Sequence, residues 1–478
     1  MTDPLTRAGR FTTTAGTPQV SDGLGAKAGA ARPLAAEPFR FTFVCEPTET
    51  LTDETCEYVK AAFQNVGKRI AQALQIYEPI HVQATFRSFC NGQLPCSLSN
   101  TLGTAASAAY FSARPSGDTS EDGWAFYPQS LVKQLDTDYA LTYNPYDLLA
   151  SFNADYNFWF SASGLPIQPD QTDFEWLCAH ELVHGLGMQS GWSLWSSTYP
   201  PSQGFPASGH VLAPVLNVDL PDGADAATPD DTVVTSWQPL NRFDQFLRDA
   251  AAAPLSAQAK TIGTFQALNA TLREFITQFQ QHPAAAAAAE AAYNATTSGT
   301  AAVTFQSWKD AQGLPTPRGP NGQAPAMQLT LATSPGEFLP GTSLAHVDYA
   351  TYANSAEFLM VPSVQNLTGT TFDTYIAKAN ATSRGALVGP FGPLTLGLLH
   401  ALGWPTVKEP ARGSLTVNPL PGTFGGATNT TASQPAEATT TASPSSSRSA
   451  AGSSGPRALL ALVLLLPLWQ LSSALLLV

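Results

Sequence analysis

The pattern of apolar and polar residues predicts a strand, a helix and a second strand where the ordered chain begins. Residues 40–46 read RFTFVCE and alternate with the period of two that a half-buried strand requires. Residues 55–77 repeat apolar side chains at spacings of three and four, which is typical of an amphipathic helix, and residues 80–89 alternate again. This order predicts a layered α/β fold.

The same patterns divide the rest of the folded chain. Residues 105–113 and the long, aromatic-rich stretch 147–162 predict strands, and a helix is expected from Asp173. The segment that follows is rich in Pro, Gly and Ala, and its helix-like patches LNRFDQFLRDAAAA and FQALNATLREFITQFQ suggest an insertion that forms a lid or rim. A strand is expected again at MQLTLA, and residues 389–404 predict a turn followed by a helix.

These elements predict six segments. They are a disordered N-terminal segment (1–37), an N-terminal catalytic subdomain (38–192), an insertion (193–345), a C-terminal subdomain (346–408), a Ser/Thr/Pro-rich stalk (409–457) and a hydrophobic tail (458–478).

The tail predicts attachment to a membrane. Residues 458–478 read ALLALVLLLPLWQLSSALLLV, about the length that spans a bilayer. Small residues at Ser445, Ser446 and Ser447, a polar spacer and this tail match a glycosylphosphatidylinositol (GPI) signal, which predicts a lipid-anchored protein at the cell surface. The alternative is a tail anchor that keeps its helix. The first residues contain no apolar stretch of a signal peptide.

Five sequons favour a secreted glycoprotein, because the acceptor triplet Asn-x-Ser/Thr is used on surfaces outside the cytosol. The candidate glycosylation sites are Asn269, Asn294, Asn366, Asn380 and Asn429.

The composition limits the expected classes of binding partner and the expected oxidation state of the cysteines. The chain of 478 residues carries 23 Lys and Arg against 36 Asp and Glu, which gives a net charge of −13, and it contains no basic run. Nucleic acid is therefore not expected as a partner. Cys90 and Cys96 bracket a short loop and are one expected disulfide, and Cys45 and Cys56 are another. Cys178 is left over and is expected to be packed rather than reactive.

The candidate chemistry lies in residues 173–187, DFEWLCAHELVHGLG. Asp173 is placed to cap a helix on which His180 and His184 lie four residues apart, hence on one face, where they can share a zinc ion. Glu181 can reach a water on an open coordination position of that metal. Gly187 is expected to end the helix in a left-handed conformation.

A catalytic zinc takes a third protein ligand and keeps one position open. The remaining candidates are any carboxylate and the five other histidines, His81, His210, His282, His346 and His400.

The sequence HELVHGLG, a long insertion and a histidine followed by a Leu-Met-x-Pro segment together resemble the leishmanolysin-type metzincin peptidases. The resemblance covers residues 140–190 and 340–405 and implies an α/β (α+β) zincin fold. Such a fold has a twisted mixed sheet, an active-site helix and a smaller C-terminal subdomain. The compact metzincin motif would place its third histidine at position 190, which is Ser190 here.

Residue by residue, the resemblance implies three zinc ligands, His180, His184 and His346, with Glu181 as the general base and Met360 as the turn methionine beneath the metal. His210 and Asp348 are the substitutes for His346 as third ligand. Family members are often surface-anchored by the same lipid device.

The expected function is zinc-dependent hydrolysis of protein or peptide substrates, with one catalytic zinc ion and Glu181 as base. The strand expected at residues 147–162 is the hypothetical edge on which an extended substrate adds by backbone pairing. The alternative is a non-enzymatic surface adhesin that keeps a zincin fold.

Overall fold

The computed structural model describes residues 32–418 except for short gaps, so the expected stalk beyond residue 418, the tail and most of the N-terminal segment lie outside the described residues. The gaps fall at residues 46–51, 91–100, 121–122, 200–208, 220–227, 301, 311–314, 318, 320–322, 365–366, 384 and 411. Among the described helices, none combines the length and the apolar character needed to cross a bilayer.

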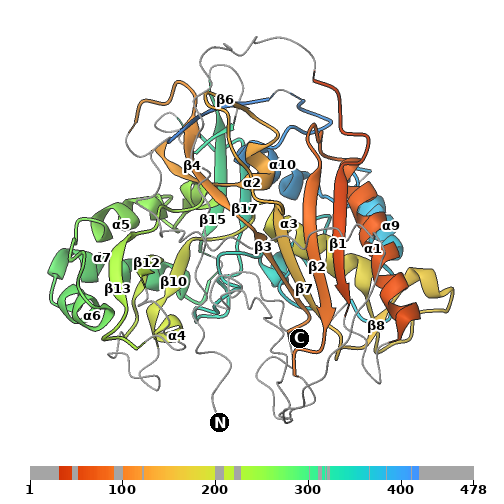
Figure 1. Ribbon diagram of the computed structural model, residues 1–478, viewed down its shortest axis with the longest axis horizontal. Coiled ribbons are helices and arrows are strands. Elements are labelled where there is room, and N and C mark those ends of the chain that lie inside the picture. The colour runs from red at the N-terminus through yellow and green to blue at the C-terminus, as the bar shows by residue number, and fades with distance from the viewer. Residues whose placement is uncertain are drawn as a thin grey trace, which may run out of the picture.

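The first sheet of the molecule is a four-stranded mixed sheet with the strand order β1-β2-β7-β3. The first three strands run parallel and β3 pairs antiparallel with β7, so β3 is an edge strand. Helices α1 and α3 pack against this sheet and against each other (Figure 1). The bounds are β1 Phe39–Cys45, α1 Asp53–Ala71, β2 Ile80–Arg87, β3 Gly103–Ser107, β7 Leu148–Asn153 and α3 Phe174–Gly185.

The predicted opening of strand, helix and strand is confirmed, and its core is aromatic. Strand β2 alternates buried and half-buried residues along its whole length, as its sequence requires. The ring of Phe63 on α1 meets Phe152 on β7 and Phe174 on α3 edge to face, with centroids 5.2 and 6.1 Å apart. These contacts fix α3 against the sheet.

Two strand predictions are wrong in detail. Residues 147–162 are not one strand, because a turn separates β7 from the short strand β8 (Phe158–Trp159). Strand β7 is paired on both sides and is therefore interior to the sheet, not an edge. Residues 105–113 likewise divide between β3 and β4 (Tyr110–Pro115), which belong to different sheets.

A second four-stranded sheet has the order β5-β4-β18-β6. Strand β18 (Ser414–Val417) pairs antiparallel with β4 and parallel with β6, so the folded chain extends past the expected boundary at residue 408. The remaining bounds are β5 Ala125–Pro128, α2 Gln129–Val132 and β6 Asp136–Thr137.

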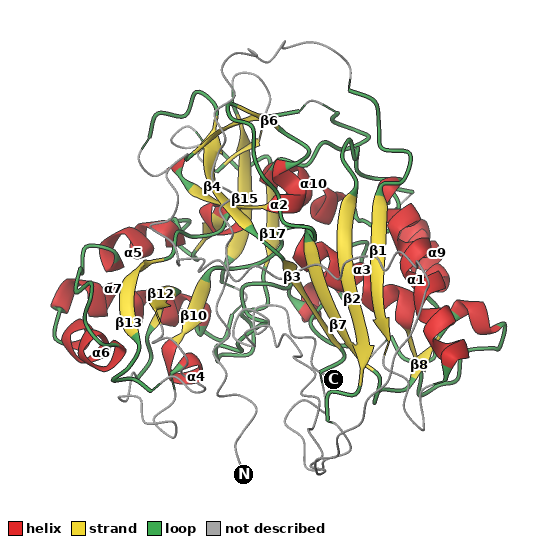
Figure 2. Cartoon of the chain, in the orientation of Figure 1, coloured by secondary structure: helices red, strands yellow, loops and turns green. Residues whose placement is uncertain are grey.

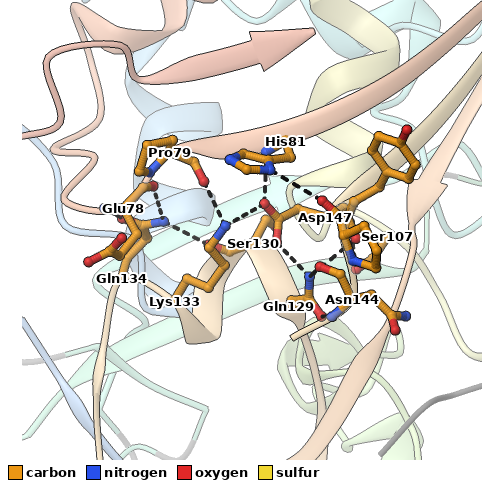
Figure 3. Close-up of polar contacts among 12 residues, drawn as sticks. Glu78, Pro79, His81, Ser107, Gln129, Ser130, Lys133, Gln134, Asn144 and Asp147 are labelled. Atoms are coloured by element: carbon orange, nitrogen blue, oxygen red, sulfur yellow. Dashed lines mark hydrogen bonds and ion pairs between the residues drawn. The ribbon is translucent and has the colours of Figure 1, made fainter. Parts of the chain in front are cut away.

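A buried polar network joins the two sheets (Figure 3). The carboxylate of Asp147 accepts hydrogen bonds from the backbone N–H of His81 at 2.8 Å and from the side chains of Lys133 and Gln129, both at 2.7 Å. Lys133 also donates to the carbonyl of Pro79 at 2.6 Å. Every polar atom of the Asp147 carboxylate thus has a partner, which holds α2 against the start of β7.

The insertion forms a lobe of small sheets and helices beside the main sheet (Figures 1 and 2). Its aromatic core includes Trp195, Trp237 and Phe279. The helix expected in LNRFDQFLRDAAAA is instead the 3₁₀ helix η5 followed by β14, whereas the second patch does form α6. The bounds are β10 Trp192–Leu194, α4 Trp195–Thr198, β11 Leu212–Pro214, β12 Leu216–Asp219, β13 Val233–Trp237, η5 Arg242–Phe246, β14 Leu247–Arg248, α5 Leu255–Ile262, α6 Leu272–Gln280, α7 Pro283–Thr296, β15 Thr304–Lys309, β16 Pro315–Thr316 and β17 Met327–Thr330.

The C-terminal elements are tied to α3 by buried carboxylates. Asp173 accepts from the backbone N–H of Glu175 and from that of Phe372, both at 2.8 Å, so one side chain serves the first turns of α3 and α9. Glu357 accepts from the N–H groups of Leu394 and Thr395, at 2.8 and 2.7 Å, at the start of α10. The bounds are β9 Thr172–Asp173, η3 Ser161–Ser163, α8 Tyr349–Tyr352, η6 Phe358–Met360, α9 Phe372–Thr382 and α10 Pro393–Leu402, the helix expected after the turn at residue 389.

Candidate metal centre

Helix α3 carries two of the candidate ligands on one buried face. Asp173 caps it as predicted, and His180 and His184 are both 0% exposed. A Cβ at Gly185 would collide with the Leu148 side chain on β7, so glycine lets this helix approach the sheet closely. Gly187 adopts a φ of +122° directly after the helix, which confirms the predicted left-handed turn.

His346 comes from far along the chain and completes the group. Its Nε2 atom lies 3.0 Å from Nε2 of His180 and 3.3 Å from Nε2 of His184, and the last two atoms are 3.1 Å apart. The backbone carbonyl of His346 accepts from the N–H of Ala332 at 3.0 Å, and the next residue, Val347, donates to the carbonyl of Met360 at 2.9 Å. These hydrogen bonds hold His346 opposite α3.

In each histidine, the contact that Nδ1 makes with a backbone carbonyl fixes the tautomer of the ring. Nδ1 of His180 lies 2.6 Å from the carbonyl oxygen of Leu359, Nδ1 of His184 lies 2.8 Å from that of Met188, and Nδ1 of His346 lies 3.4 Å from that of Thr342. A carbonyl only accepts, so each Nδ1 carries the proton and each Nε2 presents a lone pair. Three lone pairs thus converge with no proton between them, an arrangement that a cation stabilises.

Burial keeps the three rings neutral. It lowers the pKa of His184 to about 4 and the pKa values of His180 and His346 well below the ordinary range, and the neighbouring histidines lower the last two further. Neutral imidazole is the form that binds metal ions. The His180, His184 and His346 cluster is therefore able to hold a metal ion.

Glu181 lies beside this cluster and is not a member of it. It is 0% exposed, and neither carboxylate oxygen makes a hydrogen bond. Burial raises the pKa of Glu181 well above its ordinary value; the nearby backbone N–H of Ala105 opposes this rise without reaching hydrogen-bond geometry. A Cβ at Gly103 would lie 3.2 Å from Cγ of Glu181, so this side chain lies against the edge strand β3.

Met360 lies in the turn that supports His180. It is 0% exposed in η6, which packs against α3, and the carbonyl that His180 contacts belongs to the preceding residue, Leu359. The predicted methionine turn is thus in contact with the metal helix.

The substitutes for the third ligand lie elsewhere. His210 stacks edge-on against Tyr293, with ring centroids 4.5 Å apart, and Asp348 caps α8 by accepting from the backbone N–H of Thr351 at 2.9 Å. The other histidines have local roles: His81 in the network around Asp147, His282 at the start of α7, and His400 in an ion pair with Glu409.

The cysteines follow the predictions as far as the described residues reach. Cys45 and Cys56 form a disulfide, Cys90 is disulfide-bonded, and Cys96 lies outside the described residues. Cys178 is a buried free thiol whose pKa is raised well above the ordinary value by burial, so it is packed and not activated.

The candidate glycosylation sites differ in exposure. Asn269 and Asn294 are exposed, whereas Asn380 is half-buried and accepts from the backbone N–H of Leu387 at 3.3 Å. Asn366 and Asn429 lie outside the described residues.

Sequence reasoning missed the supports of the site. The three tautomer-fixing groups are backbone carbonyls of Leu359, Met188 and Thr342, which any residue type supplies, so no sequence signal identifies them. The second cap made by Asp173 depends on a residue 199 positions away and was equally hidden.

Fold and site together define an α+β protein with mixed sheets and a buried cluster of three histidines able to hold a metal. The chain matches the SPBPB7E8-like family over residues 24–446 and belongs to it. It is also similar to a protein of Schizosaccharomyces pombe named "Uncharacterized protein PB7E8.01", at 30% identity over 146 residues, which is 30% of this chain and 25% of that relative's length. No solved structure matches the chain.

Proposed function

We propose that this protein is a zinc-dependent endopeptidase of the metzincin type, related in its site to the leishmanolysin-like enzymes. The observation that carries the proposal is the convergence of three imidazole Nε2 atoms within 3.3 Å of one another, with an unpartnered buried carboxylate on the adjacent residue of the same helix. A purely structural metal would not need that carboxylate.

The donor set fits zinc. Two nitrogens that each lie roughly 2.0–2.1 Å from a tetrahedral ion are about 3.3 Å apart, and the observed separations are 3.0 to 3.3 Å. Each ring is oriented by a backbone carbonyl, the kind of outer contact that metal-binding histidines use. Three neutral imidazoles leave a fourth position for water or substrate. A zinc ion held by the three rings would lower the pKa of a water ligand to about 7 and would polarise a carbonyl.

Glu181 is the general base in this proposal. It accepts a proton from the attacking water and passes it to the leaving amine. Burial opposes ionisation of this side chain, and a cation held by the adjacent histidines favours it. The base therefore depends on the metal site being filled.

The edge strand β3 is the proposed docking strand for an extended peptide. It replaces residues 147–162 in this role, because β7 is paired on both sides, whereas among the described strands β3 is paired on one side only and lies against Glu181. An added strand bonds through its backbone, so proline in the substrate should block cleavage where pairing is required. Peptides scanned with proline test this, and cleavage indifferent to proline would exclude it.

We further propose that the chain is held at the cell surface by a lipid attached near Ser445, Ser446 or Ser447. Treatment of cells with phosphatidylinositol-specific phospholipase C releases a lipid-anchored protein. A tail-anchored protein stays with the membrane fraction.

The decisive experiment compares the full chain with its Glu181→Gln and His346→Ala variants. Zinc per chain and cleavage of a casein-type substrate are measured on the same samples, with Glu290→Gln, an exposed position on α7, as the matched control. Glu181→Gln should keep one zinc and lose activity by about 10²–10⁴-fold, whereas His346→Ala should lose zinc. Undiminished activity of Glu181→Gln would refute the peptidase.

The second candidate function is a non-enzymatic surface protein that uses the metal as a scaffold. It is favoured by one observation: His180, Glu181, His184 and His346 are each 0% exposed. Stoichiometric zinc in a wild-type chain that cleaves no peptide, together with a wild-type zinc affinity in Glu181→Gln, is the result that selects it.

A further inference from the structure

A cavity of about 940 Å³ lies between the second sheet and the insertion lobe, and none of the metal-site residues lines it. Its wall is built from the ends of β4 and β18, the 3₁₀ helix η5, the first turn of α5 and the C-terminal end of α10. The volume is typical of a site that encloses a small organic molecule.

Arg242 in this wall is a buried charge without a counter-charge. The residue is 6% exposed, its guanidinium donates to the Gln245 side chain, and its Nε has no acceptor. No carboxylate in the described part of the chain forms an ion pair with it. Its guanidinium carbon lies 4.7 Å from the ring centre of Phe246 and 5.7 Å from that of Tyr127. The hydroxyl of Tyr127, also in the wall, is buried and has no hydrogen-bond partner.

A buried guanidinium without a partner anion is destabilising, so this wall calls for an added hydrogen-bond acceptor. The guanidinium of Arg242 can only donate and the Tyr127 hydroxyl can donate, and the two residues line the same cavity. A ligand with negatively charged oxygens is the chemistry that satisfies the two groups together.

The rest of the wall favours the same sign of ligand. Among the described lining residues, the other cationic side chains are those of Arg248, Lys260 and Arg412, and the carboxylates are those of Asp118 and Asp310, in a chain whose net charge is −13. Nη2 of Arg412 pairs with Asp136 at 2.7 Å, while its Nη1 is buried without an acceptor.

The first turn of α5 adds a partial positive charge. Pro254, Ser256 and Ala257 line the cavity. The N-cap residue Pro254 provides no side-chain hydrogen bond to this turn, in which the backbone N–H of Ala257 donates to the Pro254 carbonyl at 3.0 Å. An uncapped helix N-terminus attracts anions.

We propose that this cavity binds a small organic anion through a carboxylate or phosphate group held by Arg242. The planar guanidinium offers two parallel donors to such a group, and the Tyr127 hydroxyl supplies a third. The apolar part of the ligand lies against Leu240 and the Trp124 ring, which also line the cavity. This inference does not depend on the metal centre or on the proposed peptidase activity.

Succinate and inorganic phosphate are the probes, and sodium chloride at matched ionic strength is the blank. Thermal unfolding and titration calorimetry are run on the full chain, on Arg242→Gln and on the control Arg273→Gln, an exposed arginine that pairs with Asp230. At least one probe should bind the wild type and the control alike and bind Arg242→Gln at least 10-fold more weakly. The probe that binds identifies the group, carboxylate or phosphate.

Three results overturn the proposal: equal binding by Arg242→Gln and wild type, stabilisation matched by sodium chloride, or no binding of either probe at 100-fold molar excess. If Arg242→Gln does not fold, Arg242→Lys and Tyr127→Phe replace it. Lysine keeps the charge without the planar fork, and phenylalanine keeps the ring without the donor. Each should weaken binding several-fold, and unchanged binding in both refutes the site.

Discussion

The metal centre and the Arg242 cavity are both buried polar sites, and they are unbalanced in opposite directions. In the first, three Nε2 acceptors converge with no donor among them. In the second, the guanidinium of Arg242 can only donate, the hydroxyl of Tyr127 can donate, and a buried polar atom of each has no hydrogen-bond partner. Native proteins satisfy nearly all their buried polar groups. The sign of each imbalance therefore indicates the charge of the partner, a cation in one site and an anion in the other.

The two sites also differ in how they are supported. Each histidine of the metal centre is oriented by a backbone carbonyl within the core, so its geometry is rigid before a metal binds. The cavity instead draws its wall from separate elements of the core and the insertion.

One buried carboxylate connects the two regions. Asp244 lies in η5 two residues after Arg242 and accepts from the Ser190 hydroxyl at 2.7 Å and from the N–H groups of Gly191 and Asn241 at 2.7 and 3.0 Å. Ser190 lies two residues after Met188, and the Met188 carbonyl orients His184. A change at Asp244 can therefore reach both sites.

Removal of the metal should give the largest effect. A ligand present at 1,000 times its Kd stabilises the folded state by about 4 kcal/mol, so a chelator should lower the unfolding free energy of the zinc-loaded chain by at least about this amount. Thermal unfolding with and without EDTA measures it. The His346→Ala variant should show no such difference, because two imidazoles remain and the third lone pair is lost.

The same experiment separates the two sites. Stabilisation by succinate or phosphate should persist after EDTA, since no metal-site residue lines the cavity. Loss of the anion effect together with the metal would contradict the independence of the two regions. An EDTA effect of equal size in His346→Ala would show that the metal binds elsewhere.

The contrast also explains what the sequence could predict. Helical periodicity alone places His180 and His184 on one face. His346 was predicted only through the resemblance to a peptidase family, which rests on the Leu-Met-x-Pro segment that follows it. The cavity gave no signal, since Arg242, Arg248, Lys260 and Arg412 are spread over separate elements and only tertiary packing brings them together.

The wrong predictions have local causes. Residues 147–162 keep a strand-like apolar pattern through a turn, so the pattern concealed the break between β7 and β8. In η5, Phe243 and Phe246 are three residues apart, a spacing that an α-helix and a 3₁₀ helix both satisfy. Strand β18 is four residues long and is formed by pairing with β4 and β6, which a composition-based boundary at residue 408 could not detect.

Replacement of Asp244 by asparagine should give the next largest effect, and it depends on pH. Burial raises the pKa of Asp244 to about 7 against three opposing hydrogen bonds, whereas the unfolded chain keeps the ordinary value of 3.8. Between these values the folded state holds a proton that the unfolded state has released, so stability falls as the pH rises from about 4 to 7. Asp244→Asn should remove on the order of 4 kcal/mol of this loss.

Urea unfolding of wild type and Asp244→Asn at pH 4, 5.5 and 7.5 measures the difference, with Asp230→Asn as an exposed control. Parallel stability profiles for wild type and Asp244→Asn would show that this carboxylate is not the titrating group. Zinc and succinate affinities measured on Asp244→Asn then test whether Asp244 affects both sites. A change in both affinities shows that the carboxylate couples the two regions.

Met360→Leu should give the smallest effect. Met360 is fully buried in the turn whose Leu359 carbonyl contacts His180, and leucine has nearly the same volume as methionine. The exchange should therefore cost less than about 1.5 kcal/mol of stability and leave zinc affinity within a few-fold of wild type. Met360→Ala leaves a cavity under the turn and should cost about 2–5 kcal/mol. Isothermal titration with zinc and urea unfolding measure both. A large loss of zinc affinity in Met360→Leu at unchanged stability would show that the thioether itself, and not only the shape of the packing in this turn, supports the metal site.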